Sequence, residues 1–201
     1  MHRISGVQRD AAMPRPFDWW LLFERVYIRD IVLVKSAGNT GGAILNQLDP
    51  IMDLAGPHYP MIVVGGVYPT GEQHPYSSYG PEVDIWAQMS HVLCASPDGP
   101  IRYQYGLGTS FAAPAVAGLA AYFLSHLNPE IQNLVRVEGQ VARRAKAFIK
   151  ATAYARLLPP PARTMIAYNG ETMTLQEDIL RNARFYIELS LLERSLPPPP
   201  G

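Results

Sequence analysis

Two short apolar runs in the first third of the chain lack the polar alternation of a strand with one exposed face. Residues 31–34 read Ile-Val-Leu-Val, and residues 61–67 read Met-Ile-Val-Val-Gly-Gly-Val. Continuous β-branched runs of this length are typical of parallel strands that are covered on both faces. Shorter strands are predicted at residues 83–87 and 91–94.

Apolar residues that recur at helical spacing predict three helices among these strands, at residues 17–29, 110–127 and 132–150. The middle helix is rich in alanine, which allows close backbone approach and predicts a central position. A fourth helix is predicted at residues 174–192, where Thr174 opens a capping box. Strands that alternate with helices indicate an α/β fold with a mainly parallel sheet.

Breaker residues and composition divide the chain into four parts. Residues 1–16 are expected to be irregular, 17–155 to form the folded domain, 156–196 to be an extension with one helix, and 197–201 to be a solvated proline tail. The chain has 201 residues, of which 48% are hydrophobic and 17% charged. That composition is typical of a globular chain and not of a disordered one.

Charge and cysteine content exclude several classes of protein. The 17 basic and 17 acidic residues give a net charge of 17 − 17 = 0, without the basic excess of a nucleic-acid-binding protein. The longest low-charge apolar run, residues 111–124, is shorter than the ~18 residues of a membrane span, so no membrane partner is expected. A single cysteine, Cys94, allows no internal disulfide and is expected to be a buried core thiol. Neither a metal nor a cofactor is expected; no secretory signal is visible, and the compartment stays open.

The stretch that points to chemistry is residues 106–114, which read GLGTSFAAP. A Thr-Ser pair stands where the helix begins, and there the macrodipole and free N–H groups favour a nucleophilic serine and a developing oxyanion. Pro114 cannot bond the carbonyl of Ser110, so the chain is expected to turn sharply there, without a regular helix through Ser110. Spacing alone leaves open that Thr109 or Ser110 is an ordinary helix cap.

Four stretches, in the same order, resemble the subtilases, the subtilisin-like serine proteases. Residues 108–118 (GTSFAAPAVAG) resemble the nucleophile motif, and residues 31–41 (IVLVKSAGNTG) resemble a strand and the loop whose Asn completes the oxyanion hole. Residues 59–67 are similar to Y-P-x-V-I-x-V-G-A. Residues 76–87 are similar to F-S-x-x-G-P-x-V-D-V-x-A, although Gln-Met follows where the family has P-G. The resemblance covers about residues 20–155.

The resemblance implies a role for each matching residue. Ser110 is expected to be the nucleophile, and the Asn39 amide and the Ser110 N–H to bind the oxyanion. Ser36, Ala37 and Gly38 match the segment that lines the pocket for the residue before the scissile bond. Sedolisins share a G-T-S motif but stabilise the oxyanion with Asp, so Asn39 favours the subtilases. The residues expected to support the motif are Gly108, Thr109 and Pro114.

The family's acid and base are missing from their expected places. In subtilisins the triad runs Asp, His, Ser along the chain, and the oxyanion Asn falls between His and Ser. Only His2 precedes Asn39, it does not stand in an H-G-T motif, and no D-[ST]-G motif occurs. The resemblance therefore implies the carboxyl-terminal half of a three-layer subtilisin-like domain. The remaining histidines are expected to be loop or surface residues: His58, His74, His91 and His126.

Three hypotheses follow for function. In the first, the chain is part of a serine endopeptidase that acts on peptides or proteins, and it is inactive alone. In the second, it is a degenerate protease-like protein that binds peptides or partners. In the third, it pairs with a separate chain that carries the Asp and the His. D-[ST]-G and H-G-T motifs encoded in frame upstream of Met1 would favour the first. A soluble, cooperatively folding monomer would favour the second.

Overall fold

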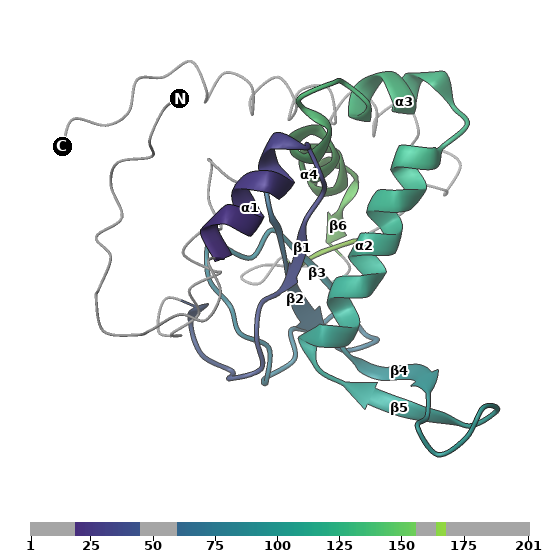
Figure 1. The fold of residues 1–201 in the computed structure, drawn as a ribbon. Coiled ribbons are helices and arrows are strands. Elements are labelled where there is room, and N and C mark those ends of the chain that lie inside the picture. Colours follow the sequence, from purple (N-terminus) through teal and green to yellow (C-terminus); the bar gives the residue numbers. More distant parts are fainter. Residues whose placement is uncertain (1–18, 45–59, 156–163, 168–201) are drawn as a thin grey trace.

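The structure, a computed structural model, describes residues 19–44, 60–155 and 164–167. Their helices and strands follow one another in a mixed order (Figure 1). The elements are α1 (Trp19–Ile28), β1 (Val34–Ser36), β2 (Ile62–Val67), β3 (Ile85–Gln88), β4 (Ser90–Ala95), β5 (Tyr103–Leu107), α2 (Thr109–Ser125), α3 (Pro129–Val135), α4 (Val141–Thr152), β6 (Tyr154–Ala155) and β7 (Met165–Ile166).

A mainly parallel sheet forms the centre of the molecule, as predicted. Its strand order is β1-β2-β3-β7-β6, and only the pair β6–β7 is antiparallel. Val64 in the middle of β2 is in register with Ser36 on one side and with Ile85 on the other. Strands β4 and β5 form a separate antiparallel hairpin that projects from the body of the molecule (Figure 1).

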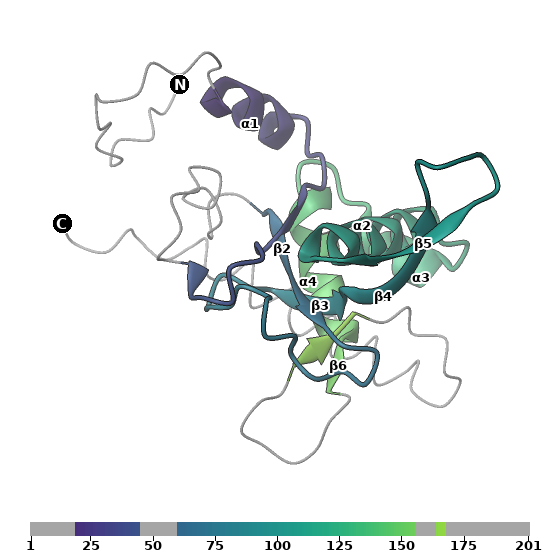
Figure 2. The same cartoon turned by 90° about the horizontal axis from the view of Figure 1, so that it is seen from below.

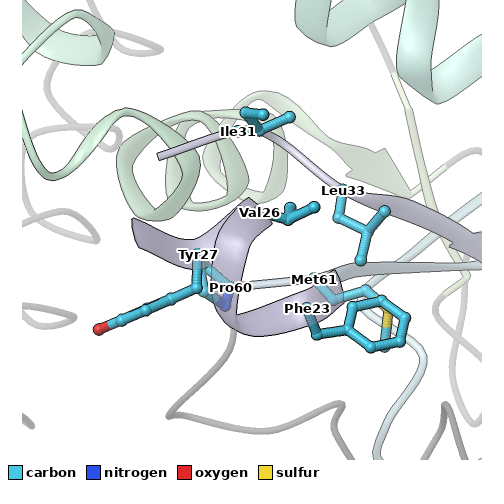
Figure 3. Close-up of a pocket in the computed structure, with 7 residues that line it drawn as sticks. All are labelled: Phe23, Val26, Tyr27, Ile31, Leu33, Pro60 and Met61. Atoms are coloured by element: carbon cyan, nitrogen blue, oxygen red, sulfur yellow. The ribbon is translucent and has the colours of Figure 1, made fainter. Parts of the chain in front are cut away.

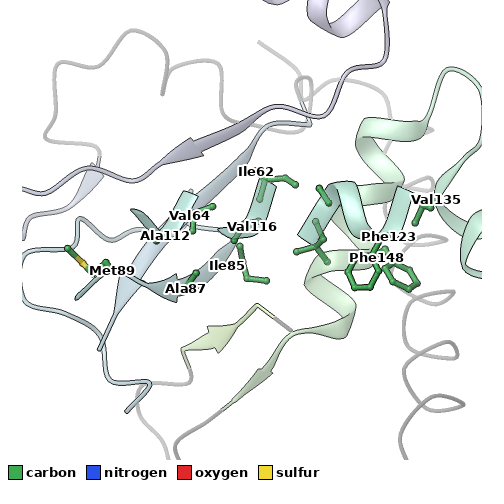
Figure 4. Packing of buried hydrophobic residues seen from close by; sticks show 12 residues of the cluster. Ile62, Val64, Ile85, Ala87, Met89, Ala112, Val116, Phe123, Val135 and Phe148 are labelled. Carbon is green, nitrogen blue, oxygen red and sulfur yellow. The ribbon is translucent and has the colours of Figure 1, made fainter. Parts of the chain in front are cut away.

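The core lies on the face of the sheet that α2 and α4 cover (Figures 2 and 4). All six residues of β2 are buried, which confirms the expectation of a strand covered on both faces. Ile62 and Val64 pack toward α2, whereas Val63 packs on the other face with Ala37 and Ile44. The helical residues of the main cluster are Ala112, Val116, Ala120, Phe123, Val135, Phe148 and Ile149.

The central helix α2 is apolar all round but is covered on one side. Ala112, Val116 and Ala120 are buried against the sheet, whereas Ala117 and Ala121 on other faces are exposed. Among the described residues no single helix is long and apolar enough to cross a membrane, although α2 and α3, which meet at 116°, have the length and composition when taken together.

Helix α1 lies across the segments that lead into β1 and β2. A small apolar pocket remains there, lined by Phe23, Val26 and Tyr27 from α1 and by Leu33 and Met61 from the sheet side (Figure 3). Phe23 is buried, as the helical pattern predicts, while Leu22 is exposed.

Several elements differ from their predicted bounds. The strand predicted at residues 31–34 begins only at Val34, because its pairing with β2 starts opposite Ile62. The hairpin strand β5 was not indicated by the pattern, since four of its five residues are exposed. Cys94 is only half-buried, on this hairpin, so the expectation of a core thiol is wrong. Outside the described residues lie the predicted segments 1–16, 174–192 and 197–201, and also His58. Strand β7 lies beyond residue 155, the predicted end of the folded domain, and joins the main sheet.

The helix predicted at residues 132–150 is two helices, α3 and α4, separated at residues 136–140. Gly139 has a φ of +72°, a backbone conformation outside the helical region. The amide groups of Val141 and Ala142 at the start of α4 donate to the Asp30 carboxylate, at 2.6 and 2.9 Å. A cap that comes from a distant part of the chain leaves no local signal, which is why the break was not predicted.

Replacing Asp30 with alanine is expected to lower the free energy of unfolding by about 0.5–2 kcal/mol, because two amide groups at the start of α4 lose their acceptor. Urea unfolding followed by circular dichroism measures this. Asp98→Ala is the control, since within the described residues the Asp98 carboxylate hydrogen-bonds only the Ser96 hydroxyl, in an exposed turn. Equal stability of the Asp30 and Asp98 variants would contradict the capping role.

Candidate active site

Asn39 lies in the loop after β1 and is held by the residue before Ser110. The Thr109 amide donates to Oδ1 of Asn39 at 2.8 Å, and the Thr109 hydroxyl donates to the same oxygen at 3.0 Å. That hydroxyl also accepts the Gly38 amide at 3.2 Å. Thr109 is fully buried, whereas Asn39 is exposed. The carbonyl end of the Asn39 amide is therefore anchored on the protein, and its NH₂ end is left for other partners.

Gly108 brings the chain close to that NH₂ group. It has a φ of +140°, in the region that favours glycine, and a Cβ atom here would lie 3.3 Å from Nδ2 of Asn39. The Gly108 amide donates to the Met89 carbonyl at 2.8 Å, which fixes the end of the hairpin against the start of α2. Gly108 thus makes the sharp turn into the helix and leaves room for the Asn39 amide.

Ser110 is the second residue of α2 and is exposed to solvent. The expectation that a regular helix would not extend through Ser110 is wrong, because α2 begins at Thr109 and the sharp turn falls at Gly108. Pro114 has no N–H, so the helix lacks one hydrogen bond, the one that the Ser110 carbonyl would accept. Both residues are exposed, so solvent can hydrogen-bond this carbonyl instead. A 3.0 Å bond from the Phe111 amide to the Gly108 carbonyl closes the first turn.

The segment predicted to bind substrate leads directly to Asn39. Ser36 ends β1, and the Ala37 amide donates to the Val64 carbonyl at 2.9 Å, which continues the pairing with β2. Ala37 is buried, so its side chain packs inward, while Ser36 and Gly38 are half-buried. The structure thus brings residues 36–39 and 108–110, the two groups of predicted site residues, into one place.

A second loop supports Asn39, and the sequence reasoning assigned it no role at the site. The Ser78 amide donates to the Gly38 carbonyl at 2.9 Å, and the Gly41 amide donates to the Tyr76 carbonyl at 3.0 Å. The Thr40 amide donates to the Ser78 hydroxyl at 3.3 Å. The family-like stretch at residues 76–87 contains this loop and is the sequence signal that points to it.

No acid–base partner of Ser110 is found in the part of the chain that the structure describes. The Ser110 hydroxyl has no hydrogen-bond partner there, and His74, His91 and His126 have other contacts. His74 lies in a loop, as expected, and is buried there, which lowers its pKa. Within the described ranges, no group of three or more His, Cys, Asp or Glu side chains could hold a metal ion.

Comparison with known proteins identifies the family of this chain. A model of the subtilase family matches residues 12–180. The chain belongs to the subtilase family. Its relatives include Subtilisin-like protease 1 of Pseudogymnoascus destructans, which is 32% identical over 140 residues, or 70% of this chain and 32% of that protein.

Solved structures of proteases show the fold of this chain. A protease from Pseudoalteromonas arctica superposes with a TM-score of 0.58 at 22% identity, over 80% of this chain and 45% of that one. A cold-adapted subtilisin-like serine proteinase superposes with a TM-score of 0.54 at 23% identity, over 69% of this chain and 45% of that one. The fold is therefore an incomplete subtilisin-like α/β fold. This subtilase chain spans less than half the length of each of these three proteins.

Proposed function

We propose that this chain carries the nucleophile and the oxyanion hole of a serine endopeptidase that cleaves peptide bonds in peptides or proteins. Ser110 Oγ attacks the scissile carbonyl, and the Asn39 NH₂ group and the Ser110 N–H stabilise the tetrahedral oxyanion. Ser36, Ala37 and Gly38 form one wall of the pocket for the residue before the scissile bond. Gly108, Thr109 and Pro114 support the turn that presents Ser110.

The observation that carries the proposal is the pair of hydrogen bonds from Thr109 to Oδ1 of Asn39, at 2.8 and 3.0 Å. An amide whose oxygen is held in this way keeps its NH₂ donors oriented before substrate arrives. Preorganised donors of this kind stabilise a developing oxyanion without the cost of reorientation during the reaction. The positive end of α2, where Ser110 lies, acts in the same direction.

The serine needs a base that the described residues do not supply at this site. A serine hydroxyl is a weak nucleophile unless an adjacent group takes its proton. We propose that an Asp–His pair on another segment supplies it. The exposed alanines of α2, the helix whose second residue is Ser110, support this proposal, because they leave an apolar surface beyond Ser110 for such a segment.

Complementation tests the proposal. The chain is co-expressed with a segment of a subtilase relative that carries the D-[ST]-G and H-G-T motifs, called here the complementing segment, and hydrolysis of a fluorogenic peptide is measured. We expect hydrolysis by the pair, none above background by either part alone, and loss of activity in Ser110→Ala. Equal activity of the pair and its Ser110→Ala variant would contradict the assignment of Ser110.

The degenerate protease-like protein is the second function that an observation favours, namely the absence of a base at Ser110 within the described residues. It predicts a different result in the same experiment. A chain that folds alone as a soluble monomer, binds peptides and stays inactive with the complementing segment would support a binding protein over a peptidase.

A further inference from the structure

His74 is buried in the loop that supports Asn39, with 5% of its surface exposed. The ring of His74 contacts those of Tyr68 and Tyr76, with centroid distances of 4.3 and 5.4 Å. Its Nδ1 accepts the backbone N–H of Tyr76 at 3.2 Å. A side-chain acceptor that bonds the amide two residues further on resembles an Asx turn. His74 therefore helps to fix the conformation of the turn that follows it.

This hydrogen bond requires a neutral imidazole, because Nδ1 can accept a hydrogen bond only while its lone pair is free of a proton. A protonated ring would place an N–H against the Tyr76 N–H. The pKa of His74 lies below its ordinary value of 6.5, chiefly because burial disfavours the cation and also because of the charge of His91. In the described part of the chain, the titratable groups that contact His74 are Tyr68 after β2 and Tyr76 in the turn, and His91 in β4 acts on it through its charge.

The residue that His74 fixes also holds the Asn39 loop. The carbonyl of Tyr76 accepts the Gly41 amide at 3.0 Å, and the Tyr79 amide donates to the Gly42 carbonyl at 3.1 Å. Gly41 has a φ of +66°, and a Cβ atom there would lie 2.5 Å from the Pro75 carbonyl oxygen. The two loops are in close contact at this point, so a displacement of Tyr76 must be transmitted to Gly41, two residues from Asn39.

We infer that His74 is a pH-sensitive positioning residue for the Asn39 loop. The neutral ring holds the Tyr76 turn through its hydrogen bond, and this turn holds Asn39 at the start of α2. Protonation of His74 breaks this hydrogen bond and lets the turn and the Asn39 loop move. Only the consequence for catalysis rests on the proposed function. Because the native state resists protonation, the unfolded chain binds more protons between the two pKa values. The stabilising effect of this contact is complete above about pH 6.5 and decreases as the pH falls toward the native pKa.

Two substitutions separate the hydrogen bond from the titration. His74→Asn retains an oxygen that can accept the Tyr76 amide but does not titrate, whereas His74→Phe retains a ring without an acceptor. His126→Asn is the matched control, since Nδ1 of His126 accepts the Asn128 amide at 3.0 Å with the same spacing, at the junction of α2 and α3.

The experiment is a pH titration of the full chain from about pH 5 to 8, followed by the NMR amide signals of Gly38, Gly41 and Gly42. In the wild type and in His126→Asn, we expect these signals to shift with the same midpoint as the His74 ring. In His74→Asn they should stay constant, and in His74→Phe they should resemble the low-pH wild type at every pH.

Glycine signals that do not follow the His74 titration in the wild type would overturn the inference. So would a pH response that persists in His74→Asn. If His74→Phe does not fold, the wild type and His74→Asn still decide between these outcomes. The measurement uses no substrate, so its result is independent of whether Ser110 is catalytic.

Discussion

In the complemented enzyme, Asn39→Ala is expected to lower kcat by ~10²–10³, the range for loss of one oxyanion donor in a subtilisin, itself a subtilase. The donor acts mainly on the transition state, so KM should change little. Steady-state kinetics with a fluorogenic peptide measure both constants. A loss confined to KM would contradict the role of Asn39, because it would indicate a contact made equally with bound substrate.

Thr109→Val and Thr109→Ser are the matched controls for this prediction. Valine removes the hydroxyl that donates to Asn39 at 3.0 Å but keeps the backbone donor at 2.8 Å. Serine keeps both donors. We therefore expect the kcat of Thr109→Ser to be close to that of the wild type, and the kcat of Thr109→Val to lie between those of the wild type and Asn39→Ala. A valine variant with full kcat would show that the Thr109 hydroxyl does not orient Asn39.

The largest effect on stability is expected at Asp84, where Asp84→Ala should lower the free energy of unfolding by about 3–5 kcal/mol. Only 7% of the Asp84 side chain is exposed, and its carboxylate accepts Lys146 at 2.8 Å and the Val63 amide at 3.0 Å. Burial lowers the pKa of Lys146, and the charge of Asp84 opposes this shift. Without Asp84, the Val63 amide loses its acceptor. The largely buried Lys146 ammonium group loses its carboxylate partner and is left with the Met61 carbonyl, at 2.8 Å.

Lys150→Ala is the control for Asp84. Lys150 also contacts Asp84, at 3.0 Å, but 45% of its side chain is exposed, so its loss should cost about 0–1 kcal/mol. Urea unfolding of the three proteins gives the comparison. Similar losses from Asp84→Ala and Lys150→Ala would contradict the view that the buried pair with Lys146 dominates at this site.

The elements that were predicted well are those whose signal is local. The apolar run that becomes β2 needs no partner to be recognised, and the small-residue helix α2 follows from its own sequence. The break between α3 and α4 depends on Asp30, which is more than a hundred residues away along the chain from Val141. The start of β1 depends on its register with β2. Such features are set by tertiary contacts, which the pattern of a single segment does not contain.

The same distinction applies to the site. The motif at residues 106–114 and Asn39 could be found from the sequence because each belongs to a short family-like stretch. The hydrogen bonds that join Asn39 to Thr109 span 70 residues and appear only in the folded chain. His74 was expected in a loop or at the surface, and its burial arises from the packing of Tyr68 and Tyr76 around it. A base for Ser110 must come from residues outside the family-like stretches that contain Asn39 and Ser110, so these stretches alone do not identify it.

Labelling of Ser110 by a fluorophosphonate probe tests the central claim most directly. The claim is that the chain presents a preformed nucleophile site that lacks only its base. We expect the complemented enzyme to be labelled rapidly at Ser110, and the chain alone to react about 10⁶-fold more slowly, the cost of removing the base of the triad in a subtilisin, itself a subtilase. Ser110→Ala should not be labelled. Rapid labelling of the chain alone, or no labelling of Ser110 in the complemented enzyme, would contradict the account.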